Sequence, residues 1–289
     1  MRYFEYFRPD SLKEAVSFLD SHRGECKVLA GGTDLLVRLR RWQIEPRYVV
    51  NLKGVDGLTG IEALSDGGLR IGALTTLSDV AGSPLVQGGF GVVAQAASKI
   101  GSVQVRNLAT IGGNLCNAAP SADMAPSLMA LGARAVLSGT GGERDLLLEE
   151  FFVGPGEAAL SEDEVLTHII VPPPAPGGVC LYWKQGGRRA MDIAIVGVAV
   201  ALRPSVGACQ GVRIVLGAVA PVPMRARGAE AYLEGKTPGY DVSQEVGRLA
   251  SEEARPISDV RASEYYRRRL VAVLVKRQVA EAWRLAARP

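Results

Sequence analysis

The proline-rich segment VPPPAPGG, residues 171–178, limits the possible folds of this chain more than any other feature. Proline fixes φ and carries no N–H group, so four prolines within this segment exclude a helix or an inner strand there. Helices and strands alternate with glycine-rich segments before it, whereas three strand-like runs and then helical ones follow it. Because 289 residues are enough for two domains, we predict two α+β domains, residues 1–175 and 176–289.

The predicted second domain begins with three runs that have the apolar, β-branched composition of strands, namely VCLYWKQG, DIAIVGVAVAL and VRIVLGAVA. We expect these runs to form a three-stranded antiparallel sheet. Helical periodicity follows over residues 227–233, 244–254 and 263–286. This pattern predicts the smaller domain of the chain, a sheet packed with helices.

The first domain mixes helices and strands. Ser11 and Glu14 have the spacing of a capping box, which predicts a helix over residues 11–20. Residues 27–29 are expected to form a short buried strand. A second helix is indicated by the apolar residues Leu35, Leu36, Leu39 and Trp42. Further strands are predicted over residues 48–52 and 69–74, and further helices over residues 94–100 and 124–131.

Two glycine segments resemble each other, AGGTD at residues 30–34 and TIGGN at residues 110–114. Each contains a glycine pair, ends in a polar side chain and leads toward a predicted helix. Two ordinary surface turns would explain them, and so would a pyrophosphate site in which clustered N–H groups hold phosphate oxygens. No GxGxxG motif opens a helix, so a Rossmann dinucleotide site has no support. The EGKT at residues 234–237 is not a Walker A loop, because Glu230 stands where the first glycine should be.

Charge, cysteine and histidine content exclude several classes of function. The net charge of +3, from 33 basic and 30 acidic residues, gives no electrostatic footprint for nucleic acid. The basic run at residues 267–269 lies beside Glu264 and is typical of a solvated helix face or a partner contact. Four dispersed cysteines and two histidines offer neither a metal signature nor a hydrolytic triad. The chain starts without a signal-peptide pattern, and its longest apolar run, residues 193–202, is too short to span a membrane, so we expect a soluble, cytoplasmic protein.

Three segments in this order and spacing, LAGGTDLL, QVRNLATIGGNLCNAAPSADMAPSLMALGA and DIAIVGVAVAL, resemble the FAD-binding (medium) subunit of the molybdenum hydroxylases. This family includes bacterial xanthine dehydrogenase, carbon monoxide dehydrogenase and related aldehyde and N-heterocycle dehydrogenases. The resemblance covers nearly the whole chain. It implies a two-subdomain FAD-binding fold of the vanillyl-alcohol oxidase type, followed by the smaller α+β domain.

The resemblance also implies which residues bind FAD noncovalently. The first glycine segment, with the residues that lead into and out of it, would hold the pyrophosphate from one side: Lys27, Val28, Leu29, Ala30, Gly31, Gly32, Thr33, Asp34 and Leu35. The second would hold it from the other side: Ala109, Thr110, Gly112, Gly113 and Asn114. Asn117 and Asp123 would bind the sugar and ribityl hydroxyls, for which carboxylate and amide oxygens are suitable acceptors.

Three further positions match residues that surround the flavin in relatives. Lys184 lies where family members often place a basic residue near the ring, where a cation tunes the flavin potential. Ile100 and Leu166 match apolar positions that line the flavin. The residues alone equally allow an exposed strand lysine and two ordinary core aliphatics. The cysteines are too few and too dispersed for the branch that reduces hydroxybenzoyl-CoA, whose members carry an additional iron–sulfur cluster in this subunit.

The function implied by the resemblance is electron transfer. The chain would take electrons from the [2Fe–2S] clusters of a small subunit and pass them to NAD or another acceptor. The molybdenum cofactor would lie on a large subunit, in a dimer of heterotrimers. NLCNAAPSAD looks closer to the xanthine and N-heterocycle type than to carbon monoxide dehydrogenase. Two alternatives remain at this point, a free-standing FAD-dependent oxidoreductase with its own substrate and a scaffold that only senses FAD.

Overall fold

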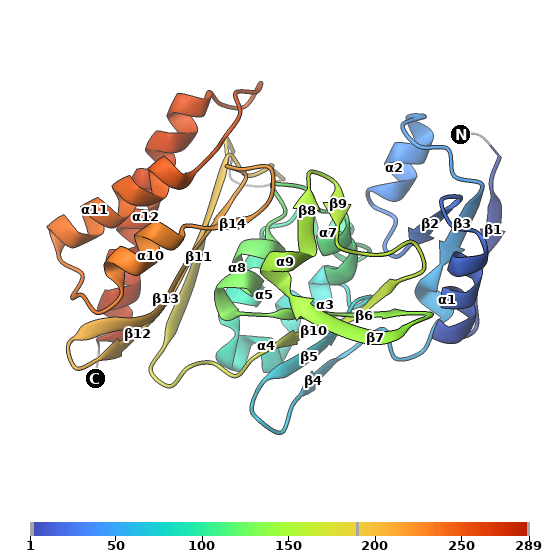
Figure 1. Ribbon diagram of the computed structural model, residues 1–289, viewed down its shortest axis with the longest axis horizontal. Coiled ribbons are helices and arrows are strands. Elements are labelled where there is room, and N and C mark those ends of the chain that lie inside the picture. The colour runs from blue at the N-terminus through green and yellow to red at the C-terminus, as the bar shows by residue number, and fades with distance from the viewer. Residues whose placement is uncertain (1–2, 189–190, 288–289) are drawn as a thin grey trace.

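The computed structural model describes residues 3–188 and 191–287 and contains three adjoining parts (Figure 1). Residues 1–2, 189–190 and 288–289 lie outside the described residues. An N-terminal subdomain lies at one end of the molecule, a larger subdomain in the middle and the C-terminal domain at the other end. The α+β class is confirmed.

The N-terminal subdomain is a three-stranded parallel sheet with the order β1-β3-β2. Its elements are β1 (Glu5–Phe7), α1 (Leu12–Ser21), β2 (Cys26–Leu29), α2 (Leu35–Arg40), β3 (Tyr48–Asn51) and the 3-10 turn η1 (Leu52–Gly54). Helix α1 begins as predicted, because the Ser11 hydroxyl accepts from the Glu14 N–H. Strand β3 is buried in the centre, where every one of its residues is covered.

Two predictions for this subdomain are wrong in part. Strand β2 forms, but it is an edge strand rather than a buried one, and Val28 is 39% exposed. Helix α2 ends at Arg40, before Trp42, which has a φ of 60° and is half exposed. The first difference follows from the pairing, because among the described residues β2 pairs with β3 alone and therefore lies at the edge of the sheet.

The middle subdomain is an antiparallel five-stranded sheet with the order β4-β5-β10-β6-β7, packed against a group of short helices. Its strands are β4 (Ile61–Ala63), β5 (Leu69–Gly72), β6 (Arg134–Gly139), β7 (Gly142–Leu147) and β10 (Val165–Val171), with a small hairpin of β8 (Phe152–Gly154) and β9 (Glu157–Ala158). Its helices are α3 (Leu77–Gly82), α4 (Pro84–Gly89), α5 (Gly91–Ser98), α6 (Val103–Arg106), α7 (Ile111–Cys116), α8 (Met124–Leu131) and α9 (Leu148–Phe151). Helix α8 has the predicted bounds, whereas α5 ends before Ile100.

The proline segment connects the middle subdomain to the C-terminal domain. Strand β10 ends at Val171 and β11 (Val179–Gln185) begins eight residues later, with no helix or strand between them. The C-terminal sheet has the order β11-β12-β13-β14, with β12 (Val196–Ser205), β13 (Ala208–Gly217) and the two-residue edge strand β14 (Met224–Arg225). The three predicted strands therefore pair antiparallel as expected, and β14 adds a short fourth strand.

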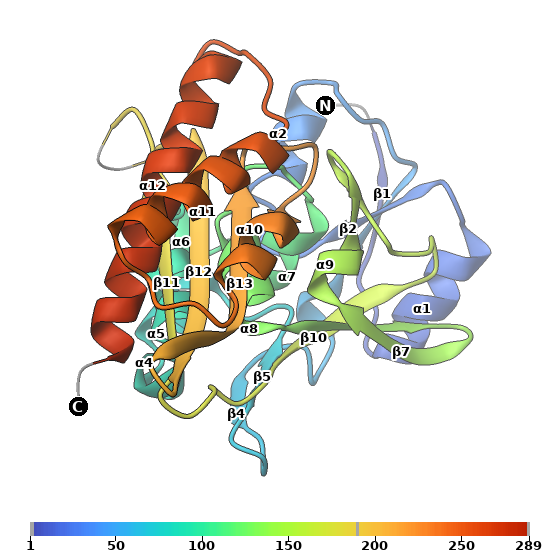
Figure 2. The same cartoon turned by 60° about the vertical axis from the view of Figure 1, so that its left-hand side comes forward.

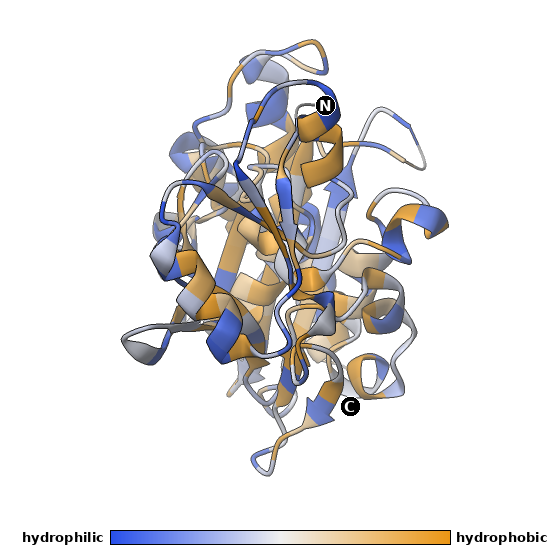
Figure 3. Cartoon of the chain, turned by 90° about the vertical axis from the view of Figure 1, so that its right-hand side faces the viewer, coloured by the Kyte–Doolittle hydropathy of each residue, from blue (hydrophilic) through white to orange (hydrophobic). Residues whose placement is uncertain are grey.

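Helices α10 (Arg227–Leu233), α11 (Tyr240–Glu253) and α12 (Glu264–Ala286) cover one face of this sheet (Figure 2). Its other face packs against α8 and α5, and Tyr182, Ala199 and Val215 of the sheet belong to the core of the middle subdomain. Apolar residues therefore concentrate in the interior of the molecule, while hydrophilic ones predominate in its peripheral loops (Figure 3). The C-terminal domain and the middle subdomain share one core.

The basic run at residues 267–269 is only partly a solvated face. Arg267 is 3% exposed and donates hydrogen bonds to the carbonyl oxygens of Ile195 (2.6 Å) and Ala218 (3.0 Å). It also forms an ion pair with Asp259 at 2.8 Å. Arg267 is thus a buried structural residue that fastens α12 to the sheet. Among the described residues, no helix is long and apolar enough to cross a membrane.

Candidate cofactor-binding site

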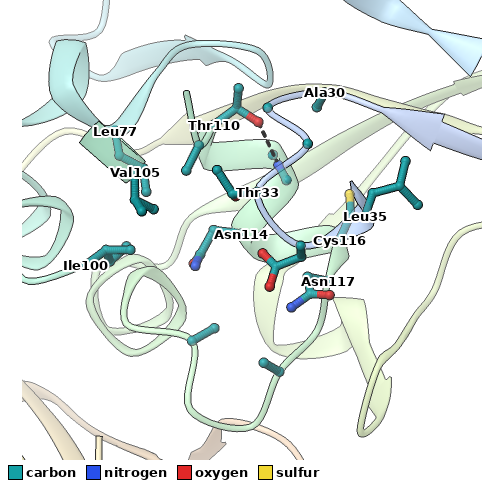
Figure 4. Close-up of a pocket in the computed structure, with 18 of the residues that line it drawn as sticks. Ala30, Thr33, Leu35, Leu77, Ile100, Val105, Thr110, Asn114, Cys116 and Asn117 are labelled. Carbon is teal, nitrogen blue, oxygen red and sulfur yellow. Dashed lines mark hydrogen bonds between the residues drawn. The ribbon is translucent and has the colours of Figure 1, made fainter. Parts of the chain in front are cut away.

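A cavity of about 660 Å³ lies where the three parts of the molecule meet. The β2–α2 loop supplies one wall, and α6, α7 and residues 117–123 supply the others (Figure 4). Strand β10 and residues 191–193 of the C-terminal domain complete the lining. A volume of this size is typical of sites that hold a whole organic ligand.

The cavity brings together nearly all the residues predicted from the sequence. Those that line it are Lys27, Val28, Ala30, Gly31, Gly32, Thr33, Asp34, Leu35, Ile100, Ala109, Thr110, Gly112, Gly113, Asn114, Asn117, Asp123 and Leu166. Leu29 and Lys184 are not part of the lining. Leu29 precedes the loop within β2, and Lys184 lies behind Asp123, with which it forms an ion pair.

The first glycine segment, residues 30–34, forms the β2–α2 loop and presents backbone donors. Within the described parts of the chain, no protein acceptor receives the N–H groups of Gly31, Gly32 or Thr33. Gly32 has a φ of +77°, a conformation that favours glycine. A Cβ atom at Gly31 would lie 2.1 Å from the carbonyl oxygen of Leu108, so the loop packs directly on the backbone that leads to the second segment.

The second glycine segment differs from the prediction. The predicted helix α8 follows it, but the segment also forms a helix itself, α7, with Thr110 as the N-cap (Figure 4). Its N–H groups are used inside the protein: Gly112 donates to the Ala73 carbonyl (2.8 Å) and Gly113 to the Thr110 hydroxyl (3.0 Å). The idea that both segments offer clusters of free N–H groups is therefore wrong for the second one. What α7 offers is a close, side-chain-free surface.

Asn114 supplies the polar group that α7 lacks in its backbone. Its Oδ1 atom is buried and has no hydrogen-bond partner among the described residues, although the residue lines the cavity. A buried polar atom without a partner costs about 1–3 kcal/mol, so this arrangement favours a ligand that completes the bond. Asn117, at the end of the same helix, also lines the cavity and adds a second amide.

Asp123 anchors the far end of the cavity through a buried network. Its Oδ2 atom receives Lys184 Nζ at 2.7 Å, and its Oδ1 atom receives the Tyr182 hydroxyl at 2.7 Å. Lys184 also donates to the carbonyl oxygen of Lys99 at 3.0 Å. Both side chains of the ion pair are 8% exposed, so the interpretation of Lys184 as an exposed strand lysine is wrong. Asp123 therefore lies between the Lys184 cation and the cavity.

The electrostatics of this network follow from burial. Burial raises the pKa of Asp123 above its ordinary value, and the charge and hydrogen bond of Lys184, together with the bond from Tyr182, oppose that rise. Burial and the Asp123 charge hold the pKa of Tyr182 well above its ordinary range, so Tyr182 is a neutral donor. Each carboxylate oxygen has further lone pairs, so Asp123 can still accept a hydrogen bond from a ligand hydroxyl.

One side of the cavity is apolar. Ile100, Val105 and Leu77 point toward the same space from three helix ends (Figure 4). Leu166 of β10 lines it from the sheet and is 5% exposed. Ile100 and Leu166 thus belong at once to the core and to the cavity wall. A flat aromatic ring would find its hydrophobic contacts on this side.

Several lining residues were missed by the sequence analysis. They are Arg38, Leu52, Ala73, Leu74, Leu77, Gly101, Ser102, Val105, Cys116, Ala119, Ser121, Ala122, Gly156, Leu160, Glu164, Val165, Met191, Asp192 and Ile193. Most are apolar or small and carry no signal that separates a cavity wall from a core. Three of them are charged, Arg38, Glu164 and Asp192, and Arg38 lies in α2, four positions after the first glycine segment.

The cysteines and histidines take no part in a metal site. No group of three or more His, Cys, Asp or Glu residues suitable for a metal ion occurs in residues 3–188 and 191–287. The four cysteines are free, and burial raises the pKa of Cys116, in the cavity wall, to about 12. His22 packs against Phe18 and Tyr48 in the N-terminal subdomain, and His168 lies in β10 beside Thr167. Neither histidine lines the cavity.

The donor set fits FAD. Free N–H groups at residues 31–33 suit phosphate oxygens, and the unpartnered amide of Asn114 requires a polar ligand group. The apolar side around Ile100 and Leu166 suits an aromatic ring, and Asp123 suits hydroxyl groups. The residues present therefore match the three kinds of surface that this cofactor has.

Comparison with known families shows which family the chain belongs to. The sequence pattern of the family described as "FAD binding domain in molybdopterin dehydrogenase" matches residues 2–174. The chain belongs to this family. A second family, "CO dehydrogenase flavoprotein C-terminal domain", matches residues 181–282. The molybdopterin dehydrogenase flavoprotein described here is thus an FAD-binding oxidoreductase subunit of the molybdenum hydroxylases.

Relatives of this flavoprotein span several activities. It is 34% identical to the carbon monoxide dehydrogenase medium chain of Hydrogenophaga pseudoflava over 280 residues, which covers 97% of each chain. It is 32% identical to the xanthine dehydrogenase FAD-binding subunit of Escherichia coli O157:H7 over 278 residues, 96% of this chain and 95% of the relative. The solved structure of the Hydrogenophaga pseudoflava carbon monoxide dehydrogenase matches with a TM-score of 0.95, 35% identity and 99% coverage of both chains. The quinoline 2-oxidoreductase structure from Pseudomonas putida 86 matches with a TM-score of 0.92, 29% identity and 99% coverage of both.

Proposed function

We propose that this flavoprotein transfers electrons within a molybdenum hydroxylase complex. It would receive them from the [2Fe–2S] clusters of a small subunit, and substrate would be oxidised at the molybdenum cofactor of a large subunit. The observation that carries this proposal is the FAD-shaped donor set of the cavity, in a chain whose relatives are named as medium chains or FAD-binding subunits. A medium chain implies smaller and larger partners. The assembly proposed is a dimer of heterotrimers.

Three surfaces of the cavity would each bind a different part of FAD. The N–H groups of residues 31–33 would bind the diphosphate, against the bare surface of Gly112 and Gly113. The amides of Asn114 and Asn117, with Asp123, would bind the sugar and ribityl hydroxyls. Ile100 and Leu166 would contact the ring. FAD, once bound, supplies the two-electron chemistry that links one-electron carriers to an acceptor such as NAD.

Lys184 would act on the ring environment through Asp123 rather than by direct contact. Its cation offsets the buried carboxylate, so this end of the cavity holds an ion pair instead of an isolated negative charge. An isolated buried anion would disfavour electron gain by any bound group. We therefore propose that Lys184 holds the Asp123 carboxylate in place as an acceptor for ligand hydroxyls and balances its charge.

We also propose that the chain consists of two domains, residues 1–175 and 176–289, and that the protein is cytoplasmic. The domain division is supported by the two family matches, the first of which ends at residue 174 and the second of which begins at residue 181, and by the unpaired segment between β10 and β11.

For the substrate we propose the xanthine or N-heterocycle type. Its support is the NLCNAAPSAD segment, residues 114–123, which contains the second half of α7 and the cavity wall after it.

Co-expression with the subunits encoded beside it tests this function. We expect a complex in gel filtration that contains iron, molybdenum and one FAD per copy of this chain, and that reduces NAD or another acceptor when it oxidises a purine or another N-heterocycle. If the chain elutes alone, binds neither iron nor molybdenum and still turns over a substrate, it is a free-standing oxidoreductase. Oxidation of carbon monoxide or an aldehyde by the complex would contradict only the substrate type.

A further inference from the structure

The charged side chains that line the cavity differ in whether they have a partner. Asp123 is paired with Lys184 at 2.7 Å and Glu164 with Arg144 at 2.6 Å. Asp192 receives backbone N–H groups, and Arg188 lies 3.9 Å from it. In the described chain, the lining residues whose charges have no ion-pair partner are Lys27, Asp34 and Arg38.

These three residues flank a single loop. Lys27 is in β2, before the first glycine segment, Asp34 ends that segment, and Arg38 is in the first turns of α2. The same loop carries the free N–H groups of residues 31–33. Two unpaired cations and one anion leave a net positive charge beside the backbone donors. This is the combination that binds a polyanion, because neutral N–H donors offer only partial charges.

The guanidinium of Arg38 is better suited than the ammonium of Lys27 to bind a polyanion. It presents a planar set of donors that can contact two phosphate oxygens at once, whereas an ammonium acts as a point charge. The diphosphate of FAD carries two negative charges, whereas the hydroxyls and the oxidised ring are neutral. The unpaired arginine is therefore matched to the charged part of FAD, which riboflavin lacks.

We propose that Arg38, assisted by Lys27, is the counter-ion for the FAD diphosphate and makes the cavity select the dinucleotide over riboflavin. The inference rests on the proposed function only in placing FAD in this cavity. It adds a specificity-determining residue outside both glycine segments. It also assigns the diphosphate to the first segment, because the N–H groups of the second one already have acceptors in the protein.

The test compares Arg38→Gln with Arg40→Gln in the full chain freed of flavin. Arg40, like Arg38, is an exposed arginine of α2, but it does not line the cavity, so its replacement removes the same charge from the same element. Affinities for FAD and for riboflavin are measured by equilibrium dialysis at low and high NaCl. We expect Arg38→Gln to weaken FAD about tenfold or more, as for a lost charged hydrogen bond, and to leave riboflavin within about twofold. The salt dependence of FAD binding should fall in the same variant, and Arg40→Gln should match the wild type.

Two outcomes overturn the inference. One is equal FAD affinity of Arg38→Gln and the wild type; the other is an equal loss in Arg40→Gln, which would indicate a general effect of net charge. Failure of the premise that FAD occupies this cavity looks different, because the wild-type chain itself would then bind neither FAD nor riboflavin. Circular dichroism of each variant shows whether the fold is kept, and Lys27→Gln, with a smaller FAD-specific loss, provides a second measurement.

Discussion

Replacing Lys184 by methionine should destabilise the protein strongly. The substitution keeps most of the side-chain volume but leaves the Asp123 carboxylate without its cation, in a site where both partners are 8% exposed. It also leaves the Lys99 carbonyl without the donor at 3.0 Å. Removing one partner of a buried ion pair costs about 3–5 kcal/mol, because the other charge stays buried. We expect a loss of that size in the free energy of unfolding at neutral pH.

The loss of stability in Lys184→Met should change with pH in a definite direction. Burial raises the pKa of folded Asp123 above its unfolded value, so the contribution of this group to stability is complete below about pH 4 and is lost as the pH rises through the folded pKa. Lys184 opposes that rise, so Lys184→Met moves the folded pKa of Asp123 further up. The difference between wild type and variant should therefore be large at pH 7 and shrink as the pH falls toward 4.

Urea unfolding of the flavin-free chain, followed by circular dichroism, measures these values. The double variant Asp123→Asn with Lys184→Met removes both charges and should recover most of the loss, so the two substitutions should be strongly non-additive. Arg248→Met is the matched control, since it removes a cation from the exposed ion pair with Glu245 and should cost only a small fraction as much. A loss in Lys184→Met no greater than in Arg248→Met, or independent of pH, would refute the argument.

Three further predictions concern the cofactor, the glycines and a thiol. Acid precipitation should release all the FAD, at one per chain, because the cavity wall has no ionised thiol; flavin that stays with the precipitate would contradict this. Gly113→Val should lower FAD content with the fold retained, since its Cβ would displace only the Thr110 hydroxyl, 2.9 Å away at the end of a side chain, and would lie 3.9 Å from Ala30 Cβ. Gly31→Ala should lower the unfolding midpoint in urea, since its Cβ would lie 2.1 Å from the Leu108 backbone oxygen. Cys116, with a pKa of about 12, should react with a thiol reagent at pH 8 only after unfolding, and rapid labelling of the native chain, located by mass spectrometry, would show that the wall opens.

Features that depend on local sequence were predictable. Helix α8 at residues 124–131 and helix α10 at residues 227–233 have the bounds expected from periodicity, because both patterns lie within a few turns of chain. The Ser11 cap of α1 likewise forms from neighbouring residues. The proline segment before β11 interrupts regular structure for a reason contained in its own residues.

Features that depend on distant neighbours were not predictable. Whether β2 is buried depends on which strands pair with it, and only β3 does. The N–H of Gly112 is satisfied by Ala73, which the sequence gives no reason to place there. Arg267 points inward because the carbonyl oxygens of Ile195 and Ala218, both distant in sequence, accept its hydrogen bonds. Most of the residues that the resemblance implied nevertheless line the cavity, because it supplied positions that periodicity could not, whereas about half of the lining carried no signal in the sequence.

The contact between Gly31 and the Leu108 backbone has a consequence for how such chains are recognised. The absence of a side chain at Gly31 is required by the packing of one backbone segment on another, whether or not a flavin is bound. A descendant that had lost its cofactor would still need this glycine to fold. The AGG motif therefore indicates the fold and not the cofactor. A survey of distant homologues for flavin dependence should instead compare the residues whose side chains or free N–H groups face the cavity, such as Thr33, Asn114 and Asp123.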